Sequence, residues 1–210
     1  MRRKAAIASM ALGILLVIGA ASLLLYNQWD DDRAAQAASQ AAQALLERIN
    51  DIPATSTPNA WEPEEILPAD AEVLNDAKKE MPVIELEGHS YIGVVDIPLF
   101  DLSLPVMETW SYDKLKISPC RYTGSIYEDN LVIMAHNYKR HFRNISSLTN
   151  GEPIIFRDAD GVEYRYVVVL IETVNSNNLQ GMIETEYDLT LFTCTYGGQA
   201  RVAVRCMADT

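Results

Sequence analysis

Cysteine, histidine and basic residues are all scarce in this chain of 210 residues. Three cysteines are too few for a disulfide-rich scaffold, and no C-x-x-C pair or Cys/His cluster has the spacing of a zinc site. The 17 basic residues are outnumbered by 29 acidic ones, so the net charge is −12. A nucleic-acid binder needs a basic surface to neutralise phosphates, and this charge argues against one. We expect no metal, no cofactor and no nucleic-acid partner.

The remaining composition is that of a folded protein. Hydrophobic residues make up 49% of the chain and charged residues 22%, which excludes a disordered chain. Domains most often contain roughly 100–150 residues, so the length allows one ordinary domain with appendages.

A long uncharged run lies near the start of the chain. Residues Ala5–Tyr26 contain no charged side chain, and at about 1.5 Å per residue such a helix spans a hydrocarbon core of about 30 Å. Basic residues precede the run and Asp30–Asp32 follow it, which predicts a single-pass type II anchor with the N-terminus inside the cell. The alternative is a cleavable signal peptide with Ala20–Ser22 as its cleavage site, although signal peptides have a shorter apolar run.

Composition divides the chain into three parts. We predict a cytoplasmic tip and transmembrane anchor over residues 1–29, an extracellular helical stalk and proline-rich linker over 30–80, and an extracellular globular domain over 81–210. Residues 33–50 are rich in Ala and Gln and contain few large apolar side chains, which predicts a solvated stalk helix. A second helix is expected around 69–80.

The globular part has the pattern of a β protein. Short runs rich in Val, Ile, Tyr and Thr alternate with turn residues, without regular helices between them. This pattern favours a closed, mostly antiparallel barrel over a parallel α/β sheet. The predicted strands are 91–97, 131–135, 153–157, 163–173, 189–195 and 201–206, with shorter ones near 83–86 and 101–106.

The most informative stretch is LTLFTCTYGGQARVAVR, at residues 189–205. Gly197 and Gly198 lie between two β-like runs and predict a two-residue hairpin turn, because the central positions of such a turn favour a positive φ. This turn places Cys194 opposite Arg201, with their Cβ atoms about 4.5–5.5 Å apart. A neighbouring guanidinium favours a thiolate, and it can stabilise the oxyanion formed when that thiolate attacks a carbonyl.

Attack on an amide also needs a proton donor for the leaving amine, which at neutral pH is usually a histidine. The chain contains three histidines. His136 follows the predicted strand 131–135, and the loops at strand ends carry functional residues, so His136 is the candidate acid. His89 lies at the edge of the first strand region and His141 lies in the basic stretch 139–143, so neither has that position.

Several segments resemble the sortases, the Gram-positive surface enzymes that join proteins to cell-wall peptides. GVVDIPLFDLSLPV (93–106) resembles the opening strand pair of that family, and LVIMAHN (131–137) resembles the segment that ends in its catalytic histidine. FRNISSLTNGEPIIFRDADGVEYRYVV (142–168) resembles the helical turn and hairpin that follow. LTLFTC (189–194) resembles the strand that ends in the nucleophilic cysteine, and Arg201 begins the run that carries the catalytic arginine.

The resemblance extends over about residues 83–206. It implies a mainly β fold, a closed eight-stranded sortase-type barrel with short helices, preceded by the transmembrane helix and stalk. It further implies a transpeptidase in which Cys194 attacks the Thr–Gly bond of an LPXTG-like sorting signal, His136 protonates the leaving amine and Arg201 binds the substrate or oxyanion. The implied partners are surface proteins that carry this signal, and an amine of a cell-wall precursor or a pilin.

Two departures from the family leave alternatives open. The interval between Cys194 and Arg201 is seven residues, shorter than is common in the family. Arg205 shares the same strand face roughly 13 Å further along and is therefore the alternative arginine. The segment 174–187 is too short for the long helical insertion of class B enzymes, and the subclass stays open.

Other residues near these motifs are secondary candidates. Asn137 and Thr193 flank the catalytic pair and are candidate substrate-binding residues. Cys120 and Cys206 are expected to be buried free thiols, or a disulfide if their Cα atoms approach closely enough.

Other functions compete with this interpretation. A catalytically inactive sortase-like scaffold or binding domain at the cell surface would have the same fold. An L,D-transpeptidase-like wall enzyme would also use Cys and His, but those proteins carry Ser-His-Gly-Cys where this chain has Leu191–Cys194 (LFTC). A papain-like peptidase places its Cys before its His, the reverse of the order here.

Overall fold

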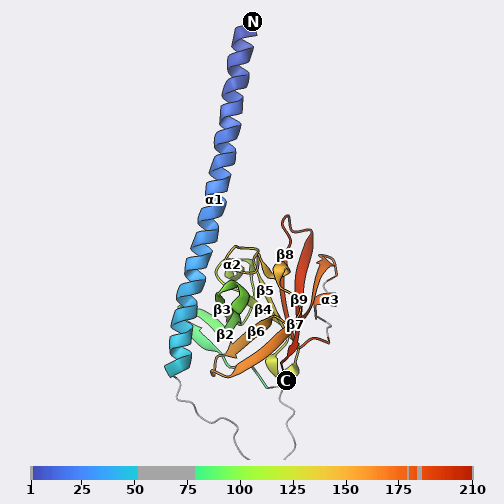
Figure 1. Cartoon of the computed structure of the whole chain (residues 1–210). Coiled ribbons are helices and arrows are strands. Elements are labelled where there is room, and N and C mark those ends of the chain that lie inside the picture. The colour runs from blue at the N-terminus through green and yellow to red at the C-terminus, as the bar shows by residue number, and fades with distance from the viewer. Residues whose placement is uncertain (1, 52–78, 179, 184–185, 210) are drawn as a thin grey trace, which may run out of the picture.

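The computed structural model describes residues 2–51, 79–178, 180–183 and 186–209 (Figure 1). A single long helix precedes a compact β domain, and only short helices interrupt the strands. The helices are α1 (Arg2–Asp51), α2 (Tyr112–Leu115) and α3 (Gln180–Ile183), with 3-10 turns at Pro98–Phe100, Ile126–Glu128 and Ile145–Ser147. The strands are β1 (Ile84–Leu86), β2 (His89–Ile97), β3 (Leu102–Met107), β4 (Cys120–Thr123), β5 (Leu131–Ala135), β6 (Pro153–Asp158), β7 (Glu163–Asn175), β8 (Leu189–Cys194) and β9 (Ala200–Ala208).

Eight strands close into a barrel. Their order is β2-β3-β4-β5-β8-β9-β7-β6, and the antiparallel pairing of β2 with β6 completes the ring. β1 pairs with the first residues of β2 and lies outside the ring. Two neighbouring pairs are parallel, β3 with β4 and β5 with β8, and the others are antiparallel. The predicted closed, mostly antiparallel eight-stranded barrel is therefore confirmed.

Each predicted strand is present, with ends that differ by at most two residues. The prediction missed β4, which has only four residues and pairs with β3 through the single couple Met107–Cys120. Strands this short carry little periodic signal, because alternation needs several residues to be recognised. The helix predicted around 69–80 lies almost wholly outside the described residues, and Lys79 and Glu80 are not helical.

The interior of the barrel is filled by aliphatic and aromatic side chains. Alternate residues of β5 and β8 point inward, so Leu131, Ile133, Leu189 and Leu191 are fully buried in the largest core cluster. The residues between them face the outside of the barrel, so Cys194 and Thr193, as neighbours on β8, point to opposite sides.

Helix α1 has two halves with different surroundings. Among its described side chains, the large apolar residues from Met10 to Trp29 are exposed, and the helix is long and apolar enough to cross a membrane. The second half lies against β1, β2 and β3 (Figure 1). One face of it is buried at intervals of three or four residues, at Ala34, Ala38, Ala42, Leu45 and Ile49. The expectation of a solvated stalk helix is wrong for this face, because small alanines allow close approach to the barrel and two large side chains then suffice to anchor the helix.

Replacing Leu45 by alanine is expected to lower the free energy of unfolding by about 2–4 kcal/mol. Leu45 is fully buried in a cluster with Tyr91, Val94 and Met107 on the outer face of the barrel, so truncation leaves a cavity. Urea titration of the detergent-solubilised protein, followed by circular dichroism, measures this change. Gln43→Ala, at an exposed position of the same helix, is the control and should change stability by less than about 0.5 kcal/mol. Equal losses in the free energy of unfolding for Leu45→Ala and Gln43→Ala would contradict the packing of α1 on the barrel.

Candidate active site

The ends of β5 and β8 bring two predicted site residues together. These strands are parallel neighbours, and their register pairs Ala135 with Thr193. The next residue of each chain is His136 and Cys194, respectively. Adjacent strands lie about 4.8 Å apart, and paired residues of a parallel couple project from the same face. His136 and Cys194 therefore lie side by side, on the outer face at one end of the barrel.

The third predicted residue comes from β9. The antiparallel register of β8 and β9 pairs Cys194 with Arg201, which confirms the predicted pairing. Directly opposed residues of an antiparallel pair share a face, so the thiol has the histidine-bearing strand on one side and the arginine on the other. Three adjacent strands, β5, β8 and β9, thus hold the three candidates.

The loop that sets this register differs from the predicted one. The Thr195 N–H donates to the Ala200 carbonyl (2.9 Å), and the Gly198 N–H donates to the Thr195 carbonyl (2.8 Å). The loop therefore contains four residues, 196–199, and the predicted two-residue turn is wrong. Both loops close on the same Thr195–Ala200 pair, which is why the strand register is unaffected. Gly197 and Gly198 have φ values of 86° and 75°, as the prediction of positive φ required.

The guanidinium of Arg201 is held by the loop backbone. Its Nη1 donates to the carbonyl oxygens of Gly198 and Ala200, each at 3.0 Å. No other partner of this group occurs among the described residues. The two bonds hold Nη1 against the loop backbone, and the other N–H groups of the guanidinium can bind a carbonyl oxygen or an oxyanion.

His136 is half-buried and lies beside an aromatic ring. Its ring centroid is 4.9 Å from that of Tyr138. Burial lowers the pKa of His136, because it disfavours the charged imidazolium; the Asp30 carboxylate opposes this shift and the Lys116 ammonium adds to it. Burial thus favours the neutral imidazole, which is the form that can accept a proton.

Cys194 is the accessible thiol. All three cysteines are free, and Cys120 and Cys206 are fully buried whereas Cys194 is partly exposed. Burial raises the pKa of Cys120 and of Cys206 to about 12, so neither forms a thiolate at neutral pH. Cys194 is therefore the one thiol of the three that solvent reaches.

The two predicted substrate-binding residues have different surroundings. Thr193 is only 3% exposed, and its hydroxyl donates to the Ala135 carbonyl (2.8 Å). Thr193 faces the opposite side of β8 from Cys194 and joins β8 to β5, and its contact with substrate stays a prediction. Asn137 is half-buried, and its amide oxygen is buried without a hydrogen-bond partner in the described part of the chain. Asn137 stays a candidate.

Arg205 is occupied by structural bonds. It is 2% exposed, and its guanidinium donates to the Glu172 carboxylate (2.9 Å), the Thr190 hydroxyl (3.1 Å) and the Gly181 carbonyl (2.7 Å). These bonds fasten α3 to the outer face of the barrel. With its donors engaged, Arg205 is not available to a substrate, and the structure favours Arg201 as the arginine of the site.

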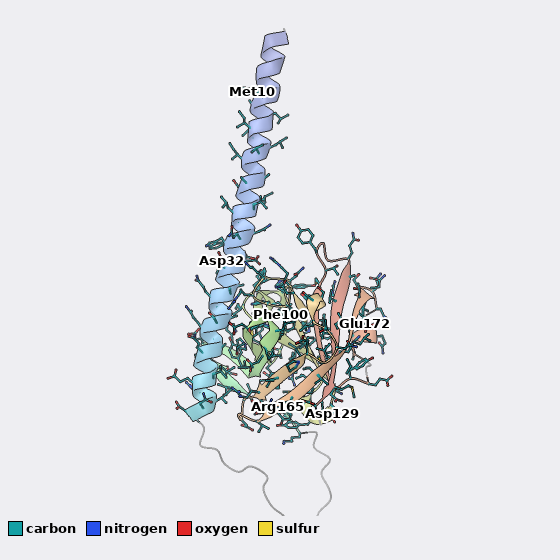
Figure 2. The ribbon with its side chains drawn as sticks, viewed as in Figure 1. Met10, Asp32, Phe100, Asp129, Arg165 and Glu172 are labelled. Atoms are coloured by element: carbon teal, nitrogen blue, oxygen red, sulfur yellow. The ribbon has the colours of Figure 1, made fainter. Side chains whose placement is uncertain are left out.

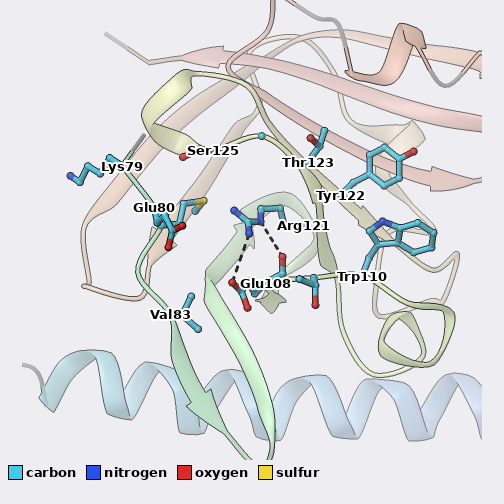
Figure 3. Close-up of a pocket in the computed structure, with 12 residues that line it drawn as sticks. Lys79, Glu80, Val83, Glu108, Trp110, Arg121, Tyr122, Thr123 and Ser125 are labelled. Atoms are coloured by element: carbon cyan, nitrogen blue, oxygen red, sulfur yellow. Dashed lines mark hydrogen bonds and ion pairs between the residues drawn. The ribbon is translucent and has the colours of Figure 1, made fainter. Parts of the chain in front are cut away.

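A cavity and a row of aromatic rings near the site were not predicted. The cavity has a volume of about 640 Å³ and lies between β4 and the chain that enters β1 (Figure 3). Arg121 crosses it and donates through Nε to the Glu108 carbonyl (3.0 Å). Trp110 and Tyr122 form its wall with ring centroids 5.8 Å apart, and Tyr122 meets the edge of Phe192 at 5.3 Å. Phe192 is two residues before Cys194 on the same face of β8. No local sequence signal could have revealed this row, since its members are distant in the chain.

Replacing Asp30 by asparagine is expected to lower the pKa of His136 further, because it removes a carboxylate that favours the protonated ring. The imidazolium of His136 in this variant then loses its proton at a lower pH than in the wild type. Lys116→Gln should move the pKa in the opposite direction, because it removes a like charge. An NMR titration of the imidazole Hε1 signal in each protein measures both shifts. Shifts of the same sign in the two variants would contradict this account of the site's electrostatics.

Comparison with known proteins identifies the fold. The family model of the Sortase domain matches residues 95–209. The barrel is also similar to the crystal structure of sortase C1 from Streptococcus agalactiae, with 25% identity and a TM-score of 0.52, over 60% of this chain and 71% of that one. No curated protein sequence matches the chain significantly.

Two further solved structures show the same fold at lower identity. Sortase A from Corynebacterium diphtheriae is 24% identical, with a TM-score of 0.50, over 65% of each chain. Sortase C1 of GBS Pilus Island 1 is 21% identical, with a TM-score of 0.50, over 57% of this chain and 64% of that one. The chain thus spans slightly less than two thirds of the length of these two proteins. Neighbours named as class A and class C leave the subclass open.

Proposed function

Because the chain belongs to the sortase family, we propose that it is a membrane-anchored transpeptidase that cleaves the Thr–Gly bond in the sorting signal of surface proteins. The strongest support is the placement of Cys194 beside His136 and opposite Arg201, at the ends of three adjacent strands. This arrangement supplies a nucleophile, a proton donor and a cationic group within one small area, which acyl transfer through a thioester requires.

In the first half of the reaction, the thiolate of Cys194 attacks the threonine carbonyl carbon of the signal. The carbonyl oxygen becomes an oxyanion, which accepts hydrogen bonds from the free N–H groups of Arg201. As the C–N bond breaks, the imidazolium of His136 donates its proton to the departing glycine amine. The products are a thioester between Cys194 and threonine, a free amine, and neutral His136.

In the second half, an amine from a cell-wall precursor or a pilin attacks the thioester. Neutral His136 accepts a proton from the attacking nitrogen, and the sulfur leaves as the thiolate beside Arg201. The new amide bond replaces the thioester, and both catalytic residues return to their starting protonation states. In this scheme Asn137 receives a substrate N–H next to His136, which is supported by its buried amide oxygen having no hydrogen-bond partner among the described residues.

Helix α1 supports the membrane-anchored part of the proposal. Its exposed apolar half is long enough to span a bilayer, so we assign residues 1–29 to the cytoplasmic tip and anchor. Residues 30–80 then form the connecting part, and 81–210 form the catalytic domain on the outer surface of a Gram-positive cell.

A peptide panel tests the proposal. The detergent-solubilised full chain would be incubated with LPxTG-like and NPxTG-like peptides plus triglycine, and mass spectrometry would follow cleavage and transfer. We expect at least one peptide to be cut after threonine and joined to triglycine. A vinyl-sulfone analogue of the same peptides reports separately on the reactivity of Cys194. Failure of every peptide together with an inert Cys194 would contradict the proposal and favour an inactive sortase-like scaffold.

A further inference from the structure

The active-site end of the barrel is fastened to the point where α1 changes its surroundings. The large apolar side chains of α1 from Met10 to Trp29, before Asp30, are exposed, and from Ala34 onward one face of the helix packs on the barrel. At the junction, the Tyr138 hydroxyl donates to the Asp30 carboxylate (2.8 Å). Arg143 pairs with Asp31, also at 2.8 Å. Both partners belong to the loop that begins with His136.

The direction of α1 fixes which end of the barrel faces a membrane. α1 is one unbroken helix from Arg2 to Asp51, so its exposed half continues the axis of the packed half. Figure 2 shows Met10 far beyond the barrel and Asp32 at the level of its upper end. In Figure 1 the labels of β8 and α2 lie at that same end. A bilayer spanned by the exposed half would therefore lie over the active-site end.

Aromatic side chains mark the height of the interface. Tyr26 and Trp29 are exposed on α1 directly before the junction, and Tyr and Trp concentrate where a spanning helix meets the headgroups. Tyr196, in the β8–β9 loop, is 98% exposed, and Tyr112 on α2 is 74% exposed. Such rings suit a layer that is apolar on one side and hydrated on the other.

The charges at this end differ from those of the rest of the chain. Four segments make up the end: the junction 30–33, α2 with Lys116, the loop 136–143 and the loop 195–199. Together they contain six basic and four acidic side chains, within a chain of net charge −12.

Most of these acidic groups are already neutralised. The carboxylates that have partners are Asp30 with Arg33, Asp31 with Arg143 and Asp113 with Lys116, while Asp32 is exposed. Lys139 and Arg140 are exposed and have no partner among the described residues. Two unpaired cations on the loop of His136 are thus free to meet anionic groups.

We infer that this end of the barrel docks on the headgroup layer of the membrane that α1 spans, with Lys139 and Arg140 bound to lipid phosphates and Tyr196 inserted among the headgroups. The inference rests on the proposed membrane anchor. The headgroup layer is roughly 5–8 Å thick on each side of the hydrocarbon core, which is within reach of these side chains from the junction. The site then opens at the membrane surface and accepts peptides that emerge from the bilayer or lie along it.

Depth measurements on the intact chain test the inference. In a Cys194→Ala background the two remaining thiols are buried, so a fluorophore placed by Tyr196→Cys labels one position. The control is Val162→Cys, next to Gly161, which lies beside Ile49 about 25 Å further down α1 from Asp32. Both proteins would be placed in nanodiscs containing phosphatidylglycerol and a headgroup-nitroxide lipid. We expect the label at position 196 to be quenched several-fold more strongly than the label at 162.

The outcomes separate the inference from the function on which it rests. Equal, weak quenching at 196 and 162 in protein that stays in the nanodisc would overturn the docking while leaving the anchor intact. Loss of the protein from the nanodisc would overturn the anchor and the docking together. Peptide transfer is measured separately in detergent, so neither result depends on it.

Charge reversal tests the electrostatic part of the inference. Lys139→Glu combined with Arg140→Glu should weaken quenching at position 196 in phosphatidylglycerol nanodiscs, because the headgroups there carry a net negative charge. The double variant should leave quenching unchanged in phosphatidylcholine nanodiscs, whose headgroups carry no net charge. Arg48→Glu, an exposed reversal at the far end of α1, is the matched control and should have no effect in either lipid. An unchanged signal in the double variant would exclude these two residues as the lipid contacts.

Discussion

Replacing Cys194 by alanine is expected to reduce peptide transfer by at least about 10³-fold, because no other group in the site can form the acyl intermediate. Arg201 carries no lone pair that can attack a carbonyl, and His136 is placed to move protons. The other two thiols are fully buried, and their pKa values of about 12 keep them protonated at neutral pH. Mass spectrometry of peptide and triglycine adducts, together with detection of the thioester on the intact protein, measures the loss.

The other cysteines provide the matched control. Cys120→Ala removes a thiol that lies in a core cluster with Met107 and Leu115, so it should cost stability. Its transfer rate per folded molecule should stay close to that of the wild type. If Cys120→Ala abolished transfer while Cys194→Ala did not, the nucleophile would be misassigned. If both variants, Cys120→Ala and Cys194→Ala, retained peptide transfer, the reaction would not pass through a cysteine thioester.

The sequence predicted the parts of the site that depend on local pairing. The register of Cys194 and Arg201 follows from the distance of each residue to the Gly-Gly pair, and it survives a loop of different geometry. The direction of the Thr193 side chain follows from the same strand pattern. Adjacent residues of a strand face opposite sides, so Thr193 points away from the face of Cys194, and its hydroxyl donates to the Ala135 carbonyl.

Non-local contacts could not be read from the sequence. The parallel pairing of β5 with β8 places His136 beside Cys194, but the paired residues, such as Leu131 and Leu189, are 58 positions apart (189 − 131). No local pattern joins them, so only the strand end and the family resemblance indicated this histidine. The bond between Tyr138 and Asp30 joins residues 108 positions apart. Helix α1 has few large apolar side chains on its buried face, so composition predicted a solvated helix where the structure has a packed one.

Two arginines on one strand face allow the roles of catalysis and folding to be separated. Arg201→Ala should lower kcat by about 10²–10³-fold, the usual loss on removing a donor to an oxyanion. It should leave the unfolding midpoint nearly unchanged, because the Arg201 bonds that the structure shows go to backbone carbonyls of its own hairpin, those of Gly198 and Ala200. Arg201→Lys should recover little, since an ammonium cannot present the planar pair of N–H groups.

Arg205→Ala should show the converse pattern. It removes a fully buried guanidinium that bonds Glu172, Thr190 and Gly181, and we expect a loss of about 2–4 kcal/mol in the free energy of unfolding. At a temperature where the variant is folded, its kcat per folded molecule should lie within about tenfold of the wild type. Arg205 pairs with Thr190, four residues before Cys194 on β8, and is therefore distant from the thiol. Urea titrations and steady-state kinetics on the same preparations give both quantities. A large loss of kcat in Arg205→Ala with normal stability, and a destabilised but active Arg201→Ala, would exchange the two assignments. The crossed pattern is expected because the guanidinium of Arg205 bonds three groups of the protein, whereas Nη1 is the only side-chain nitrogen of Arg201 with a partner among the described residues.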